Sequence, residues 1–134
     1  MSNFTVLPLP QPLGAEITGI DLGKIDDATT SRLQEALSQY LVLLFRNQTI
    51  TDAQLVATSG KFGALDVPAP NPFGEPFHKV HPEINVISNI VQDGKPAGNL
   101  GAGEAVWHAD MTYQENPPRA AILYALQVPD TGGN

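Results

Sequence analysis

The first half of the chain alternates between segments with a strand-like and a helix-like spacing of apolar residues. Residues 15–22, AEITGIDL, predict a short strand that ends at Gly23. Beyond Asp27, which we expect to be an N-cap, apolar side chains recur at helical spacing and predict an amphipathic helix of about four turns. The apolar run LVLLF at 41–45 follows and predicts a strand that is covered on both faces.

A second helix and a long loop come next. Thr51 and Gln54 have the spacing of a capping box, and one helical face continues until Gly63. Between Gly63 and Ile84 the chain contains five prolines, which exclude regular structure because proline has no backbone N–H to donate. We therefore expect residues 64–83 to form a long ordered loop or a lid.

The second half of the chain predicts mainly strands. INVISNIV at 84–91 is rich in β-branched residues, and the turn-forming sequence QDGK follows it. The glycines of 97–105 match neither the dinucleotide-binding fingerprint nor a P-loop, so we expect a mobile loop over a pocket. VWHADMTY at 106–113 and RAAILYALQV at 119–128 predict two more strands, and the second is apolar on both faces and therefore buried.

Composition limits the classes of function. The chain has 134 residues with 42% hydrophobic content, which suits one globular domain, and it has no cysteine, so any metal site must use nitrogen and oxygen ligands. A net charge of -7 removes the main driving force for binding nucleic acid. No segment has the length of a membrane span or the features of a signal peptide. We expect a soluble, cytoplasmic protein with neither nucleic acid nor membrane as a partner.

The sequence WHADMTY carries the clearest candidate chemistry. On a strand, Trp107 and Tyr113 share one face and belong to the core, while His108 and Asp110 share the opposite face. Side chains that are neighbours on one face lie about 7 Å apart at Cβ, so this imidazole and carboxylate can converge on one metal ion. They can equally hydrogen-bond to each other, and the tripeptide alone does not separate the two interpretations.

The surrounding sequence, VWHADMTYQENPPRAAILYALQVPDTGGN, resembles the taurine dioxygenase and 2,4-dichlorophenoxyacetate dioxygenase family of iron(II)- and 2-oxoglutarate-dependent oxygenases. In that family Trp-His-x-Asp is followed by an aromatic-ended strand, a Pro-Pro break, a strand that leads to Val-Pro or Leu-Pro, and a Gly-Gly pair. Four earlier segments agree with the family in the same order: PLGAEITGIDL, LVLLFRNQTIT, KFGAL and ISNIVQDGK. The resemblance therefore covers nearly the whole chain.

The resemblance implies that His108 and Asp110 are two ligands of a facial triad of two histidines and one carboxylate. Iron(II) suits these ligand types, and three protein ligands on one face leave three positions for other groups. By family likeness the cofactors are Fe(II) and the cosubstrate 2-oxoglutarate, and the partners are O2 and a small-molecule substrate. The implied reaction hydroxylates a small organic acid with release of succinate and CO2.

The resemblance also implies that residues 1–134 are the N-terminal portion of a single dioxygenase catalytic domain whose C-terminal half is absent. In the family the distal histidine of the triad and the arginine that binds 2-oxoglutarate lie beyond the Gly-Gly pair. The expected fold is α+β, mainly β: an incomplete double-stranded β-helix (a jelly roll of the clavaminate-synthase-like type) with flanking helices. We expect exposed strand edges, no activity from these 134 residues alone, and homo-oligomers of the intact enzyme.

The sequence defines the substrate less closely. Taurine-type members carry a histidine and a tyrosine in the loop after the second helix, where this chain has Pro68 and Asn71, and an asparagine where it has Glu104. These differences argue against taurine. Glu104 is a candidate substrate-binding residue for a cationic group, with a solvated loop carboxylate as the alternative. We expect Arg46 and Arg119 to be surface or structural charges, because the carboxylate-binding arginine of the family lies downstream.

Two other classes of function are compatible with the sequence. One is a non-catalytic, degenerate family member or small β-sandwich that binds a ligand or partner through the loops at 64–83 and 94–105. The other is a metal-binding β-sandwich of cupin type, complete as it stands, in which His78 or His81 supplies a substitute ligand.

Overall fold

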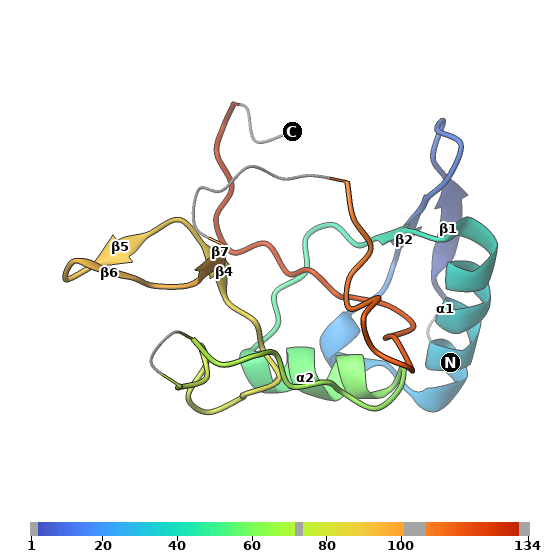
Figure 1. Ribbon diagram of the computed structural model, residues 1–134. Helices are drawn as coiled ribbons and strands as arrows, with labels where there is room; N and C mark the ends of the chain where they lie inside the picture. The colour runs from blue at the N-terminus through green and yellow to red at the C-terminus, as the bar shows by residue number, and fades with distance from the viewer. Residues whose placement is uncertain (1–2, 72–73, 101–106, 132–134) are drawn as a thin grey trace.

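The computed structural model describes residues 3–71, 74–100 and 107–131 (Figure 1). In this part of the chain the elements are β1 (Thr5–Pro8), β2 (Ala15–Thr18), the 3-10 helix η1 (Leu22–Lys24), α1 (Asp27–Tyr40), β3 (Leu43–Leu44), α2 (Asp52–Gly60), β4 (Ile87–Ser88), β5 (Val91–Gln92), β6 (Lys95–Pro96) and β7 (Asn99–Leu100). None of the helices in these ranges is both long enough and apolar enough to cross a membrane.

The first three strands form one sheet in the order β1-β2-β3. β1 and β2 are antiparallel, and β3 runs parallel to β2 at the edge of the sheet. Gly14 precedes β2 with φ +102°, and its N–H donates to the Tyr40 carbonyl at 2.8 Å, which joins the end of α1 to the sheet. The strand predicted at 15–22 is confirmed for its first four residues.

The apolar run at 41–45 contains less strand than predicted. Leu41 has a left-handed backbone with φ 66°, and it ends α1 by donating its N–H to the Leu37 carbonyl at 2.8 Å. Only β3 pairs with β2, so Leu41 and Val42 are exposed. The prediction of a strand covered on both faces is wrong because the run is divided between a helix end and an edge strand.

Helix α1 buries the face that the sequence predicts. Leu33 and Ala36 are buried in the core. The N-cap, however, is Asp26 rather than Asp27, because the Asp26 backbone is extended and its carboxylate accepts a 2.7 Å hydrogen bond from the Thr29 N–H. Asp27 is instead the first helical residue, where a negative charge suits the positive end of the helix.

Helix α2 begins at the predicted capping box. The Thr51 hydroxyl accepts from the Gln54 N–H at 3.2 Å, and the Gln54 side chain accepts from the Thr51 N–H at 2.9 Å. Two backbone donors of the first turn therefore have partners within the helix end itself. Further along α2, the buried Thr58 hydroxyl donates to the Leu22 carbonyl at 2.8 Å and fastens α2 to η1.

The hydrophobic core is built by the first sheet, η1, α1 and residues that flank these elements and α2. Its buried members are Phe4, Ile17, Leu22, Ile25 and Leu33, and the partly buried side chains that pack on them are Val6, Ile20, Leu43, Phe45, Ile50 and Phe62. Among the described residues, every buried hydrophobic side chain lies between positions 4 and 36. The segments after α2 therefore contribute little apolar burial.

Gln48, in the connection from β3 to α2, links three parts of the chain. Its side-chain oxygen accepts from the Leu22 N–H at 2.9 Å, and its side-chain nitrogen donates to the Ile20 carbonyl at 3.2 Å. The Gln48 carbonyl accepts from the Tyr124 hydroxyl at 3.4 Å, and the same hydroxyl accepts from the Ile50 N–H at 3.3 Å. One residue thus holds the loop between β2 and η1 and anchors the C-terminal part of the described chain.

The proline-rich loop is irregular, as predicted: residues 64–71 and 74–83 contain neither helix nor strand. The strand predicted at 84–91 is broken into the short β4 and the start of β5. Asp93 and Gly94 connect β5 to β6 with φ 51° and 74°, the left-handed pair of a type I′ turn, which confirms the turn at QDGK. Figure 1 shows β4 to β7 on the opposite side of the molecule from β1 and β2.

The two strands predicted at 106–113 and 119–128 are absent from the described residues. Positions 107–131 contain a turn at 110–113 but no strand. Trp107 is fully exposed and Tyr113 is 83% exposed, so neither is a core residue of the described structure, contrary to the prediction. A strand forms only beside a neighbour that completes its backbone hydrogen bonds, and no described segment occupies that position.

The described residues have an α+β arrangement of small sheets and two helices. More of these residues are helical than lie in strands, so the predicted predominance of strands is not seen in this part of the chain. The described strands do not close into a double-stranded β-helix, and that element of the fold stays a prediction.

Replacing Gln48 with methionine tests its role in the fold. Methionine keeps the length of the side chain but leaves the Leu22 N–H and the Ile20 carbonyl without partners, so we expect the free energy of unfolding to fall by about 2 kcal/mol. Urea denaturation measures this change. Gln39→Met, at an exposed position of α1, is the matched control and should change it little. Equal losses for the two variants would show that the Gln48 contacts contribute nothing specific.

The Asp26 cap predicts a pH dependence of stability. Hydrogen bonds from Thr29 hold the pKa of the Asp26 carboxyl below its ordinary value of 3.8. Because the pKa of this carboxyl is lower in the folded protein than in the unfolded chain, its ionised form stabilises the fold at any pH above the unfolded-state pKa. This stabilisation is lost as the pH falls through the folded-state pKa. Asp26→Asn keeps a good N-cap but removes the titration. We expect the stability difference between wild type and Asp26→Asn to shrink below pH 3.8, as measured by urea denaturation.

Asp66→Asn, in the proline-rich loop, is the control for this experiment. If the stability difference between wild type and Asp26→Asn stays constant through the acid range, this role of Asp26 is contradicted.

Candidate metal-ligand pair

His108 and Asp110 lie against each other in the structure. The His108 Nε2 atom is 2.9 Å from the Asp110 Oδ1 atom. The two side chains are 65% and 61% exposed, so an ion or a small molecule can reach both from solvent. The prediction that they converge is therefore confirmed, whereas their role as ligands stays a prediction.

The two side chains meet at the start of a turn and not on the predicted strand. Residues 110–113 form the turn, and the Gln114 N–H closes it by donating to the Met111 carbonyl at 3.0 Å. Met111 has φ 52°, a left-handed conformation that is uncommon for a residue other than glycine. The chain therefore reverses directly after Asp110 and does not continue with side chains on alternating faces.

The donor atoms of this pair fit a divalent ion such as Fe(II) in kind and spacing. An imidazole nitrogen and a carboxylate oxygen are both ligands that iron(II) accepts. Two ligands at right angles around one ion, each bonded at about 2.1 Å, lie about 3.0 Å apart. The separation of 2.9 Å is close to this value, and it is also an ordinary hydrogen-bond length. The geometry thus admits both interpretations that the sequence admits.

The described residues supply two candidate ligands but not three. No group of three His, Asp or Glu side chains in residues 3–71, 74–100 and 107–131 has an arrangement that could hold a metal ion. Glu104, the predicted substrate-binding residue, lies outside these ranges. A complete facial triad therefore requires a ligand in addition to the described residues.

His78 and His81, the substitute ligands of the cupin-type hypothesis, make other contacts. The His78 Nδ1 accepts from the His81 N–H at 2.9 Å, so a neutral His78 ring carries its proton on Nε2 and donates it to the Asp52 Oδ2 at 3.1 Å. This hydrogen bond ties the proline-rich loop to the first turn of α2. Both ring nitrogens of His78 are therefore engaged, which does not support His78 as the substitute ligand of the cupin-type hypothesis.

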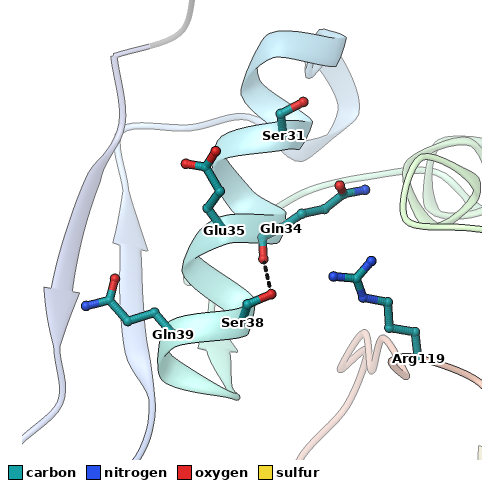
Figure 2. Close-up of a pocket in the computed structure, with 6 residues that line it drawn as sticks. All are labelled: Ser31, Gln34, Glu35, Ser38, Gln39 and Arg119. Atoms are coloured by element: carbon teal, nitrogen blue, oxygen red, sulfur yellow. Dashed lines mark hydrogen bonds between the residues drawn. The ribbon is translucent and has the colours of Figure 1, made fainter.

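An open groove of about 580 Å³ lies along an exposed face of α1, and neither His108 nor Asp110 lines it (Figure 2). Figure 2 shows Arg119 extending toward this face from the C-terminal part of the chain. The other residues that line the groove are polar and belong to α1: Ser31, Gln34, Glu35, Ser38 and Gln39. Arg46 does not line this groove, and its Nε atom lies 3.4 Å from the Glu16 Oε2 atom. Both arginines are exposed, which confirms their prediction as surface charges.

Sequence reasoning missed the residues that attach the segment carrying the pair to the core. Tyr124 follows His108 and Asp110, and its hydroxyl contacts the Gln48 carbonyl across 76 residues of sequence. Neither residue belongs to a local motif. No pattern of spacing or composition within one segment would have found this contact.

The comparisons with known proteins define the class. The chain matches the model of the taurine catabolism dioxygenase TauD, TfdA family over residues 5–134. It is 32% identical over 143 residues to an (S)-phenoxypropionate/alpha-ketoglutarate-dioxygenase of Sphingobium herbicidovorans, covering 97% of this chain and 43% of that relative. It is 32% identical over 133 residues to an alpha-ketoglutarate-dependent sulfate ester dioxygenase of Pseudomonas putida, covering 98% of this chain and 40% of that one.

A crystal structure of a taurine dioxygenase from Burkholderia xenovorans is 36% identical and covers 51% of this chain and 25% of that chain, with a TM-score of 0.48. A score below 0.5 does not establish a shared overall fold. The chain nevertheless belongs to the TauD, TfdA family, because the family model matches nearly its whole length. It spans less than half the length of the curated relatives and matches their N-terminal part.

Proposed function

We propose that this chain is the N-terminal portion of the catalytic domain of an Fe(II)- and 2-oxoglutarate-dependent dioxygenase. The single observation that carries the proposal is the 2.9 Å approach of His108 Nε2 to Asp110 Oδ1 in a chain of the TauD, TfdA family. The names of both relatives, each an alpha-ketoglutarate dioxygenase, support 2-oxoglutarate as the cosubstrate.

His108 and Asp110 bind the metal as two members of a facial triad, and the C-terminal half of the domain supplies the third ligand and the arginine for 2-oxoglutarate. When bound, Fe(II) with 2-oxoglutarate supplies the oxidation of a substrate C–H bond by O2, with release of succinate and CO2. Binding requires a lone pair on the His108 Nε2 and an ionised Asp110 carboxylate. Acid therefore opposes metal binding at both residues, because a proton competes with the metal at each.

The same proposal accounts for the exposed segments of the last third. In a completed double-stranded β-helix, strands of the C-terminal half pair with residues 106–113 and 119–128. Such pairing covers Trp107 and Tyr113, which solvent surrounds in the described structure. The 134 residues alone would then have the metal pair without a closed, water-excluding site, and we expect them to be inactive.

We propose a small organic acid as the substrate. One relative acts on phenoxypropionate, a carboxylate, and the other on sulfate esters, so both act on small organic anions. Pro68 and Asn71 stand where taurine-type members carry their histidine and tyrosine, which argues against taurine itself. Glu104 is the proposed contact for a cationic group of that acid, because its own carboxylate would repel an anionic group. The intact enzyme is proposed to be a cytoplasmic homo-oligomer without nucleic-acid or membrane partners.

A non-catalytic, degenerate family member is the second candidate. The observation that favours it is that the described residues offer two metal ligands and not three. In that case the 2.9 Å contact is only a hydrogen bond that stabilises the turn after Asp110.

Metal affinity of the 134-residue chain tests the two ligands. We expect His108→Ala and Asp110→Ala each to weaken Mn(II) binding by at least about tenfold, since each removes one ligand of the ion. Mn(II) is a redox-stable substitute for Fe(II), and its free fraction is measured by electron paramagnetic resonance. His81→Ala is the control and should bind as wild type does. Equal binding by wild type and all three variants would leave only the hydrogen-bond interpretation.

Activity is tested in a fusion protein, in which this chain is followed by the C-terminal part of one of its relatives. With Fe(II), O2 and a phenoxy acid or an alkyl sulfate, we expect 2-oxoglutarate to be converted to succinate. His108→Ala should lower the rate by more than about a hundredfold, because the ion then loses a direct ligand. Succinate is measured by chromatography, with Asp66→Ala as a control variant. Metal binding without succinate formation from any acid would favour the non-catalytic candidate.

A further inference from the structure

The His78 ring, in the proline-rich loop, accepts one hydrogen bond and donates another. Its Nδ1 atom accepts from the His81 N–H at 2.9 Å, which closes a turn within the loop. Its Nε2 atom lies 3.1 Å from the Asp52 Oδ2 atom in the first turn of α2. In Figure 1 the yellow-green chain after α2 turns back toward that helix. The ring therefore joins the conformation of the loop to the attachment of the loop to α2.

The two partners of the ring determine where its protons lie. A backbone N–H can only donate, so the His78 Nδ1 must offer a lone pair to His81. An ionised carboxylate can only accept, so the Nε2 atom carries the proton that faces Asp52. A second proton can then bind only at Nδ1, where it would point at the His81 N–H, and two donors do not form a hydrogen bond with each other. A charged His78 is therefore incompatible with the closed turn.

A second proton has the opposite effect on the contact with α2. An imidazolium ion donates a stronger hydrogen bond to a carboxylate than a neutral imidazole does. Asp52 therefore retains a charged His78 while the His81 N–H is released. Among the described residues, the other titratable group that faces the ring is the His81 imidazole, with the two ring centroids 5.4 Å apart. Because charges on both rings would repel each other, the contributions of the two histidines need separate tests.

The turn at 78–81 lies in the connection from the loop to β4. The His81 carbonyl accepts from the Ile84 N–H at 3.0 Å, so a second turn follows directly after the first. Lys79 and Val80, inside the first turn, are exposed and bury little apolar surface. The hydrogen bond at the ring therefore decides whether this connection is closed.

We propose that His78 is a proton-operated switch in the proline-rich loop. Neutral His78 closes the turn at 78–81, and charged His78 opens this turn while it stays bound to Asp52. Acid therefore loosens the connection between the loop and β4 without detaching His78 from α2. This switch needs no metal at His108 and Asp110 and is separate from the proposed dioxygenase function.

Nuclear magnetic resonance of the wild-type chain tests both states of the switch. Histidine ordinarily changes its charge between about pH 5 and pH 8, which is the range to measure. Nitrogen-15 shifts of the His78 ring report its tautomer and its second proton, and amide hydrogen exchange reports the His81 N–H. We expect the Nε2–H tautomer at the alkaline end, and a protection factor of the His81 amide that falls about tenfold as the ring becomes charged.

Two results from the wild-type chain would overturn the switch. One is a His81 amide that keeps its protection after the His78 ring has gained its second proton. The other is a His78 ring that gains no proton in this range while the protein stays folded.

Two variants assign the response to one histidine. His78→Asn supplies a side-chain oxygen that can accept from the His81 N–H but gains no proton, so the protection of that amide should not depend on pH. His81→Asn removes the neighbouring imidazole and keeps the backbone N–H, so the amide at position 81 should lose protection in acid as in wild type. The amide spectrum of each variant reports whether it is folded. A wild-type response in His78→Asn, or its loss in His81→Asn, would contradict the assignment to His78.

Discussion

The contacts of Gln48 are the constraint on which the structure depends. Its side-chain amide accepts a hydrogen bond from the Leu22 N–H and donates one to the Ile20 carbonyl. Its backbone carbonyl accepts a hydrogen bond from the Tyr124 hydroxyl. The first two contacts position Leu22 in the core. The last contact attaches the segment that follows β7 and contains the candidate pair His108 and Asp110. Because that segment buries little apolar surface, a few hydrogen bonds decide where it lies.

Local signals in the sequence predict helix caps, helix faces and tight turns well. The capping box of Thr51 and Gln54, the buried face of α1 and the Asp93–Gly94 turn all form as expected, because each depends on residues within one or two helical turns or one hairpin. Errors in the helix caps are small. Asp26 caps α1 in place of Asp27, since two adjacent aspartates are equally suited to the position and only backbone geometry selects one.

The strands of the last third could not be predicted in the same way. A strand depends on a neighbouring strand that is distant in sequence. An apolar pattern shows that a segment can form a strand, but it does not show which other segment pairs with it. Residues 119–128 have the pattern but no described neighbour. His108 and Asp110 do approach each other as expected, but the strand on which they were expected to share a face is absent, and the chain turns at the left-handed Met111 directly after them.

The question that matters most for function is whether His108 and Asp110 share one divalent cation. An anomalous difference map from crystals of this protein grown with Mn(II) answers it most directly. We expect a single peak about 2.2 Å from both the His108 Nε2 and the Asp110 Oδ1. A map in which the two side chains keep their mutual hydrogen bond while the manganese lies elsewhere would contradict the metal-ligand assignment.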